Sequence, residues 1–221
     1  MLKKSMPALL ATVVLMILLA GNLFAQPIDS KSDVSSVDSG LKETSLGDLS
    51  ADALKASASV DMAFIPSSAL RPTTLSAAGL QSGQIGDALS ANTAPANAYV
   101  TMHLKGRQIL TALERSVSHL PQSFDGFLQV SGIRVTFDAS RQEGSRIVSV
   151  TLASGAPLSP DAQYTAAMTQ PLGLGGFGYF QSWNQSDIST TSNDSLASVL
   201  TAYAIAHQPL DCHTDGRLTS K

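Results

Sequence analysis

The spacing of the apolar residues changes along this chain of 221 residues, and that change restricts the fold more than any other feature. Three segments carry apolar residues every three or four positions, as on the buried face of an α-helix. These faces are Leu46, Leu49, Ala53 and Leu54, then Ile109, Leu110, Leu113 and Val117, and finally Leu196, Val199, Leu200 and Tyr203. Strand patterns rich in β-branched and aromatic residues occupy 60–65, 100–104, 127–130, 133–137, 146–152 and 164–169. Helices at both ends with strands clustered between them predict an α+β fold, a layered mixed sheet with flanking helices.

Capping and turn residues set the limits of these elements. Thr44 or Ser45 can cap the first helix, because a side-chain oxygen there accepts a hydrogen bond from the free N–H groups of the first turn. Asn193 or Asp194 can do the same for the last helix. Two prolines and three glycines between Pro66 and Gly86 predict a loop.

The first 25 residues have the three parts of a secretory signal peptide. Lys3 and Lys4 form the basic region, Ala8–Ala20 the apolar region, and Ala25 is a small residue suited to cleavage. The apolar run is shorter than the roughly 20 residues that a bilayer requires, and Asn22 stands where a lipidated cysteine would have to be. We therefore predict an exported chain of 196 residues (221 − 25), periplasmic or secreted, without a membrane anchor after signal cleavage.

The segments on either side of the periodic region are polar. Serines crowd residues 26–40 without a repeating apolar pattern, so a flexible leader is expected there, followed by a domain over 41–206 and a tail over 207–221. Cys212 is the sole cysteine, so the exported chain must be held together by its core alone. Without its two N-terminal lysines the chain has a net charge of −5 (12 − 17), which argues against a nucleic-acid partner.

Five segments resemble a known family, in the family's order. Glu43–Ala53 reads E-T-S-L-G-D-L-S-A-D-A and resembles E-T-N-L-G-N-L-I-A-D-A, the opening helix of the 5′-nucleotidase C-terminal domain family. Leu104–Gly106 and Leu113–Val117 are similar to its L-x-G and A-L-E-x-S-V segments. Phe127–Arg134 resembles its F-L-Q-V-S-G-L-R strand, and Gly175–Tyr179 resembles its G-G-D-G-Y loop. The resemblance covers residues 41 to about 206.

The resemblance implies a division of labour. In that family, which includes nucleotide-catabolism hydrolases, an N-terminal metallophosphoesterase domain holds two metal ions and cleaves phosphate esters, while the C-terminal domain supplies the nucleoside pocket. Only the 15 residues 26–40 (40 − 25) precede the match here. The expectation is a stand-alone substrate-binding half, non-catalytic by itself, with no cofactor because the family's dimetal site is absent.

The positions that form the family's nucleoside pocket are largely substituted. Of its N-G-G-G-I-R segment only Arg71 remains, and of its P-F-x-N segment Asn97 remains. By the resemblance, Gly40 stands at the position of a family arginine, and Pro95 and Pro171 stand at those of the two base-stacking phenylalanines. Phe177 stands at the position of the ribose-binding aspartate. Stacking contributes about 1–3 kcal/mol per base, and a phenylalanine accepts no hydrogen bond from a ribose hydroxyl. Nucleoside binding in the family's manner is therefore predicted to be lost.

Two hypotheses of function remain open. A small anionic or nucleoside-like ligand could still bind Arg71, Asn97, the backbone amides of Gly175 and Gly176, and Tyr179, which closes the glycine loop. Alternatively, the former pocket docks a separate exported protein, such as a metallophosphoesterase chain. The retained arginine favours the first hypothesis, and the loss of the aromatic residues favours the second.

Other sequence motifs give weaker evidence for a chemical function. Gly173–Gly178 fits G-x-G-x-x-G but no periodic helix follows, as a dinucleotide site requires. Cys212 and His213 lack a second pair of metal ligands and are expected on a solvated tail, so no metal site is predicted. No G-x-S-x-G occurs. Glu114 and Asp125 could be paired carboxylates, but Glu114 beside an arginine is expected to be a surface charge. We identify no catalytic residues.

Overall fold

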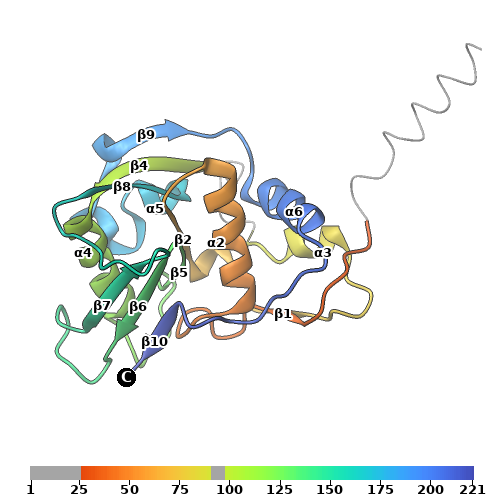
Figure 1. Cartoon of the computed structure of the whole chain (residues 1–221), viewed down its shortest axis with the longest axis horizontal. Helices are drawn as coiled ribbons and strands as arrows, with labels where there is room; N and C mark the ends of the chain where they lie inside the picture. The colour runs from red at the N-terminus through yellow and green to blue at the C-terminus, as the bar shows by residue number, and fades with distance from the viewer. Residues whose placement is uncertain (1–25, 91–97) are drawn as a thin grey trace, which may run out of the picture.

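The computed structural model describes residues 26–90 and 98–221 (Figure 1). The predicted signal peptide, Pro95 and Asn97 lie outside the described residues. Within the described ranges, no helix has both the length and the apolar character needed to cross a bilayer.

A mixed five-stranded sheet forms the centre of the fold and confirms the predicted α+β class. Its strands are β2 (Met62–Pro66), β4 (Tyr99–Lys105), β5 (Leu128–Ser131), β8 (Gln163–Thr169) and β9 (Ile188–Thr191). Their order is β5-β2-β8-β4-β9; β2 runs parallel to β8, and the other neighbours are antiparallel. The alternating burial predicted for 100–104 appears in β4, where Val100, Met102 and Leu104 are buried.

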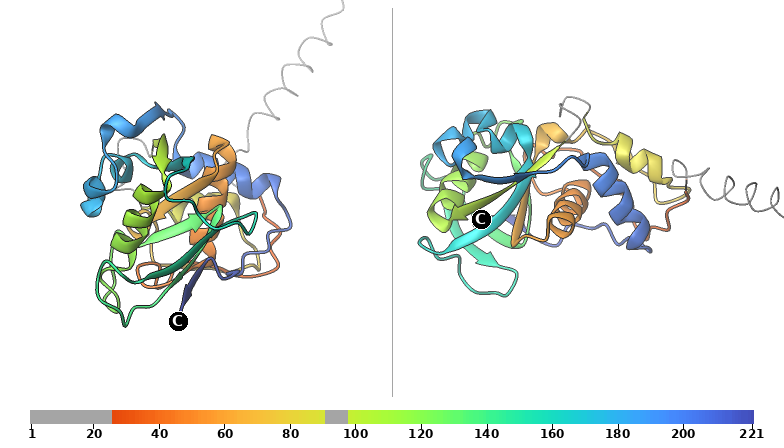
Figure 2. Two further views of the ribbon diagram at one scale, coloured as in Figure 1. Left: turned by 60° about the vertical axis from the view of Figure 1, so that its left-hand side comes forward. Right: turned by 90° about the horizontal axis from the view of Figure 1, so that it is seen from above.

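Helices cover both faces of this sheet. One face is covered by α4 (Gly106–Val117), the short α5 (Gln170–Gly173) and the 3₁₀ segment η2 (Gly176–Gln181) (Figures 1 and 2). The other face is covered by α2 (Ser45–Ala58). The helix α6 (Leu196–Ala206) packs on α2, and α3 (Ser82–Asp87) packs on α6.

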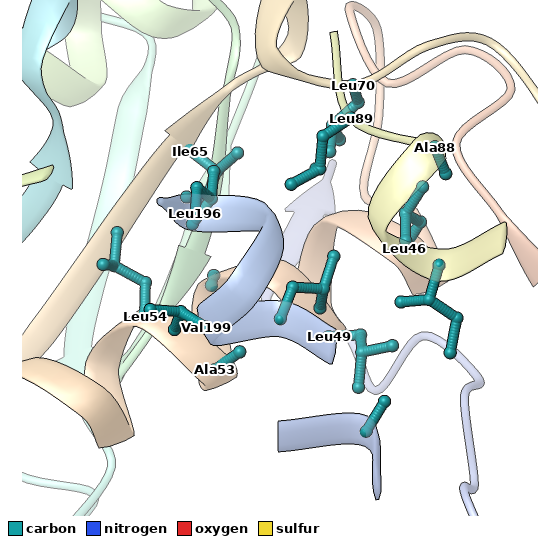
Figure 3. Close-up of a cluster of buried hydrophobic side chains, with 14 of the residues drawn as sticks. Leu46, Leu49, Ala53, Leu54, Ile65, Leu70, Ala88, Leu89, Leu196 and Val199 are labelled. Carbon is teal, nitrogen blue, oxygen red and sulfur yellow. The ribbon is translucent and has the colours of Figure 1, made fainter. Parts of the chain in front are cut away.

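The residues of β2 alternate between two cores because successive side chains of a strand point to opposite faces. Ala63 and Ile65 join the cluster with α2 and α6, which Figure 3 shows around Ile65, whereas Met62 and Phe64 join the cluster with α4.

Two smaller sheets complete the structure. One consists of β10 (Leu218–Ser220), β6 (Ile133–Phe137) and β7 (Ile147–Leu152), in that order. The other pairs β1 (Val34–Ser35) with β3 (Thr74–Leu75). Figure 1 shows β10 at the C-terminus, beside β6.

The leader expected to be flexible is part of the fold, so that prediction is wrong. Ile28 and Val34 are buried, and the backbone N–H of Ile28 donates to Leu80 O at 2.8 Å. Ser36 is also buried, and its Oγ donates to Arg71 O. Serine side chains therefore form hydrogen bonds with backbone groups of the loop beside β3. These bonds hold the segment in place although it has no periodic apolar pattern.

The tail expected over 207–221 is also ordered, and Cys212 is not solvated. Leu210 and Cys212 are buried, and burial, followed by the nearby Asp211 charge, raises the pKa of the Cys212 thiol to about 11. His213 is exposed, as expected. The folded domain thus includes residues on both sides of the predicted 41–206.

Several local expectations need adjustment. Thr44 caps α2, accepting from Gly47 N at 3.3 Å, as predicted, but Ser195 caps α6 in place of the two residues before it. The predicted loop before β4 contains α3. Glu114 is not simply a surface charge: its carboxylate accepts from the backbone N–H groups of Arg146 and Ile147 at 3.0 and 2.8 Å, which fixes α4 against β7.

Candidate functional site

The glycine loop follows β8 and turns sharply because three of its residues have positive φ. Gly175 and Gly178 both have φ of 87°, which glycine adopts without a Cβ penalty, and Phe177 has φ of 58°. A Cβ on Gly178 would lie 2.9 Å from Arg115 Nε, so α4 approaches the loop closely there. The phenylalanine is held in an uncommon conformation by its surroundings.

Aromatic and cationic side chains support the loop from one side. Arg115 Nε donates to Phe177 O at 2.9 Å, and its guanidinium lies 4.7 Å from the ring centre of Phe124. His119 stacks on the same ring with centroids 4.2 Å apart. Arg115 is therefore already engaged with the loop backbone and with Phe124.

Tyr179 lies in the core beneath the loop. Its side chain is fully buried, its hydroxyl donates to Gly126 O at 2.8 Å, and its ring stacks on Trp183 with centroids 5.2 Å apart. Burial raises the pKa of this phenol far above its usual value, because the ionised form would lose its hydration. Tyr179 was proposed from the sequence as a ligand-binding residue, and its hydroxyl already has a backbone acceptor.

Three of the substituted pocket positions meet around this loop. Phe124 N donates to Gly40 O at 3.1 Å, although the two residues are distant in sequence. A Cβ on Gly126 would lie 2.7 Å from Phe177 Cβ, and one on Gly176 would lie 2.7 Å from Pro171 O. Phe177 and Pro171 thus lie against glycines of this region, and Gly40 lies beside Phe124, whose ring contacts Arg115.

The outer surface of the loop is apolar. Leu174 is 51% exposed and Phe180 66% exposed, and within the described residues the one other large apolar side chain that is comparably exposed is Val37, at 46%. Phe180 N donates to Gly175 O at 3.1 Å, and Gly175 N donates to Leu172 O at 2.9 Å. The Gly175 amide predicted to face a ligand is therefore in use. We call Leu174, Gly175, Gly176, Phe177 and Phe180 the glycine-loop face.

Arg71 lies at a different cavity, of about 350 Å³, next to β3 and α3. It shares this cavity with Gln84 and Asp87, and no residue of the glycine-loop face lines it. The Arg71 side chain is exposed and forms no ion pair or hydrogen bond within the described part of the chain. The structure therefore does not place Arg71 together with the glycine loop, and Asn97 falls outside the described residues.

Sequence reasoning missed a charged cluster where the C-terminal segment meets α2. Arg217 Nη1 and Nη2 donate to the two carboxylate oxygens of Asp52 at 2.7 and 2.8 Å, and its Nε donates to Asp215 Oδ1 at 2.9 Å. Glu43 and Asp48 adjoin them. We call these five residues the C-terminal junction.

Burial shapes the charges of this junction. Burial by itself would lower the pKa of Arg217. The hydrogen bonds to Asp52 and the charges of Asp48 and Asp52 outweigh this effect, so the pKa of Arg217 lies above its usual value. Burial raises the pKa of Asp48 to about 9, a change that the Arg217 charge opposes and Glu43 reinforces. The sequence did hold one signal: Asp48 and Asp52 stand four apart among the buried leucines of α2, where unpaired carboxylates are rarely placed.

Comparison with known proteins identifies the family. The model of the 5′-nucleotidase C-terminal domain family matches residues 23–184. The trifunctional nucleotide phosphoesterase protein YfkN of Bacillus subtilis is 31% identical over 147 residues, which cover 62% of this chain and 10% of that protein. The 5′-nucleotidase of Bos taurus is 32% identical over 124 residues, covering 53% of this chain and 21% of the relative.

A solved structure agrees. The 5′-nucleotidase precursor of Thermus thermophilus superposes with a TM-score of 0.77 and 28% identity, over 96% of this chain and 42% of that chain. The present chain thus spans about a tenth to a fifth of the curated relatives and less than half of this structure. It belongs to the 5′-nucleotidase C-terminal domain family.

Proposed function

From its membership in the 5′-nucleotidase C-terminal domain family, we propose that this chain is an exported, non-catalytic domain whose degenerate nucleoside pocket has become a docking surface. The proposed partner is a metallophosphoesterase, which would contact the glycine-loop face and would itself hold the catalytic metal ions. The observation that carries the proposal is the exposure of Leu174 and Phe180 on the glycine loop, beside Phe177.

The loss of nucleoside binding follows from what occupies the loop. Phe177 takes the place that the resemblance assigns to a ribose-binding carboxylate, and its backbone oxygen is held by Arg115. Tyr179 is buried and its hydroxyl is bonded to Gly126 O. A ribose would find neither a carboxylate nor a free hydroxyl in this part of the loop.

An apolar partner surface suits the same loop. Burying a large apolar side chain contributes about 1.5–3 kcal/mol, and Leu174 and Phe180 keep half or more of their surfaces in water. Exposed apolar groups that cluster on one loop are typical of interaction sites. The net negative charge makes nucleic acid a poor alternative partner.

The docking test uses calorimetry with residues 26–221 of this chain as the ligand. The probe is the part of the Thermus thermophilus 5′-nucleotidase precursor that this chain does not match, which the family resemblance leads us to expect to be a metallophosphoesterase domain. We expect binding that weakens at least tenfold in Leu174→Ser and in Phe180→Ser. Val37→Ser is the matched control, because Val37 is similarly exposed but lies next to β1, and it should bind as the wild type does. Absence of binding, or equal loss in all three variants, would contradict the proposal.

The catalytic part of the proposal has its own test. Residues 26–221 should not hydrolyse AMP or a generic phosphodiester, even with added manganese or zinc, because two-metal hydrolysis needs ligands that fix both ions. Metal-dependent turnover that follows the protein through purification would contradict this part while leaving the docking test unaffected.

Export is supported by the contact that Gln26, the first residue after the predicted cleavage position, makes with the fold. Gln26 O accepts from Ser82 N at 2.8 Å, so the first residue after the predicted cleavage position already contacts the fold. N-terminal sequencing of the exported protein should begin at Gln26, without a fatty acyl group. An intact Met1 would contradict the prediction.

A second candidate function rests on Arg71, an exposed cation on a cavity of about 350 Å³. Its guanidinium could bind a small anion such as phosphate, although Asp87 lines the same cavity and opposes an anion. Phosphate should then raise the melting temperature of the wild type and of Arg107→Ala, a control at another exposed arginine, but not of Arg71→Ala. A response that survives in Arg71→Ala, or no response at all, would remove this candidate.

A further inference from the structure

The starting point is Asp48, a carboxylate buried without a hydrogen-bond partner. Its side chain is 6% exposed, and as a carboxylate it receives no hydrogen bond on Oδ1 or Oδ2 within the described residues; only a protonated Asp48 would be hydrogen-bonded, to Glu43. The nearest cationic atom that pairs with it, Arg217 Nε, lies 3.8 Å from Oδ1. Burying an ionised carboxylate in this way is costly unless a proton or a cation compensates for the lost hydration.

Two further carboxylates lie within reach of the same point. One oxygen atom from each of Glu43, Asp48 and Asp215 lies within 4.8 Å of the other two. Calcium binds oxygen at 2.3–2.6 Å, so two ligand atoms on opposite sides of one ion are separated by about 5 Å or less. The three oxygens therefore fit around a single cation.

Glu43 is held in place by the C-terminal segment. Its Oε1 accepts from the N–H groups of Asp215 and Gly216 at 2.8 and 3.0 Å, and its Oε2 accepts from Leu218 N at 2.9 Å. A carboxylate has about four lone-pair sites, so these three bonds leave acceptor capacity on the side chain. Such bonds orient a ligand in the way that outer contacts orient metal-binding carboxylates.

The charges of the region leave a deficit. The carboxylates of Glu43, Asp48 and Asp215 adjoin one another, and Asp52 joins them through Arg217. Arg217 pairs with Asp48, Asp52 and Asp215, and Arg134 pairs with Asp215. Among these ion-paired groups two negative charges remain (4 − 2), which is the charge that one divalent cation neutralises; Lys55 lines the adjoining cavity but forms no ion pair with them in the described part of the chain.

We propose that Glu43, Asp48 and Asp215 bind one divalent cation, calcium in preference to magnesium, which fastens the C-terminal segment to α2. Carboxylate oxygens are the ligands of hard cations, and calcium accepts irregular geometry where magnesium demands an octahedron. A cavity of about 250 Å³, lined by Asp215 and Arg217 among others, adjoins the cluster and can admit the waters that complete the coordination. This cation would be structural, separate from the catalytic metals of the proposed partner.

The alternative occupant is a proton. Burial raises the pKa of Asp48, and a protonated Asp48 would be hydrogen-bonded to Glu43, so a proton is the other species that these oxygens can hold. Cation and proton compete for the same oxygens, so calcium binding should release protons and tighten as the pH rises.

The test measures calcium binding to residues 26–221 after treatment with EDTA, by calorimetry and by thermal unfolding. We expect one calcium per chain, a rise of a few degrees in melting temperature, and weaker binding of magnesium. Asp48→Asn should lose at least tenfold in calcium affinity while its own melting temperature without calcium is equal to or above that of the wild type, which separates a lost ligand from a misfolded chain.

Asp161→Asn is the control, because Asp161 is an exposed carboxylate that pairs with Arg107 away from the cluster. It should bind calcium as the wild type does. A wild type that ignores calcium would show that a proton alone neutralises the site and would overturn the proposal, as would equal responses of the wild type and Asp48→Asn. Neither result bears on the glycine-loop face, which shares no residue with this site.

Discussion

The C-terminal junction and the glycine-loop face use opposite chemistry in one domain. The junction buries charge: the Arg217 side chain is 16% exposed and that of Asp48 6%. The glycine-loop face exposes apolar groups, with Phe180 at 66%. The first joins segments 165 residues apart, from Asp52 to Arg217, whereas the second is a single loop. The difference indicates that the junction maintains the fold, whereas the proposed docking function would depend on other residues.

The largest effect is expected from breaking the junction. Arg217→Ala removes the pair with Asp52 and the contact with Asp215, and leaves partly buried carboxylates without their cation. Removing one partner of a buried pair costs about 3–5 kcal/mol, and we expect a loss near 3 kcal/mol in the free energy of unfolding, measured with urea. Arg107→Ala, in an exposed pair, should change it by less than about 1 kcal/mol. Equal effects of the two substitutions would remove the contrast between the regions.

A smaller effect of opposite sign is expected from Asp48→Asn in EDTA. The folded chain holds a proton on Asp48 up to about pH 9, whereas the unfolded carboxyl releases it near 3.8, so the wild type loses stability as the pH rises between these values. Arg217, Glu43 and Asp215 act on this group, and asparagine removes its charge. The variant should be more stable by about 2 kcal/mol at pH 8, with a gain that shrinks toward pH 4 and a slope below about 1.4 kcal/mol per pH unit. Parallel stability curves for the two proteins would contradict the assignment.

The two regions also differ in how far they could be predicted from the sequence. The strands β2, β4, β5 and β8 of the central sheet and the helices α2, α4 and α6 were predictable because their apolar spacing is local, whereas the edge strand β9 was missed. The positive-φ turns of the glycine loop follow from its glycines, but the exposure of Phe180 depends on what packs beneath it. The junction was not predictable, because the pairing of β10 with β6 and of Arg217 with Asp52 joins distant segments. The short α3 was missed because its six residues cannot show a helical period.

Tyr179→Phe examines what supports the glycine-loop face from below. The variant deletes a buried hydroxyl that donates to Gly126 O at 2.8 Å and leaves that oxygen without this donor. We expect a loss of about 1 kcal/mol in the free energy of unfolding, the usual range for one hydrogen bond. Tyr164→Phe is the control, since its hydroxyl accepts from Ser159 N in an exposed contact, and it should change stability by less. A larger loss in the control would mean that the loop is not anchored through Tyr179.

The smallest effect on stability is expected at the glycine-loop face itself. Phe180→Ser and Leu174→Ser remove side chains that are 66% and 51% exposed, so each substitution removes few buried contacts from the folded chain. Each should change the free energy of unfolding by no more than about 0.5 kcal/mol, the range of ordinary surface substitutions. A fully buried phenylalanine such as Phe64 would instead cost about 3–5 kcal/mol on truncation to alanine. Near-neutral stability combined with a tenfold loss of partner binding is the pattern of a surface that serves an interaction. A loss of several kcal/mol in the free energy of unfolding would instead show that Phe180 supports the fold, and the docking proposal would lose its main apolar group.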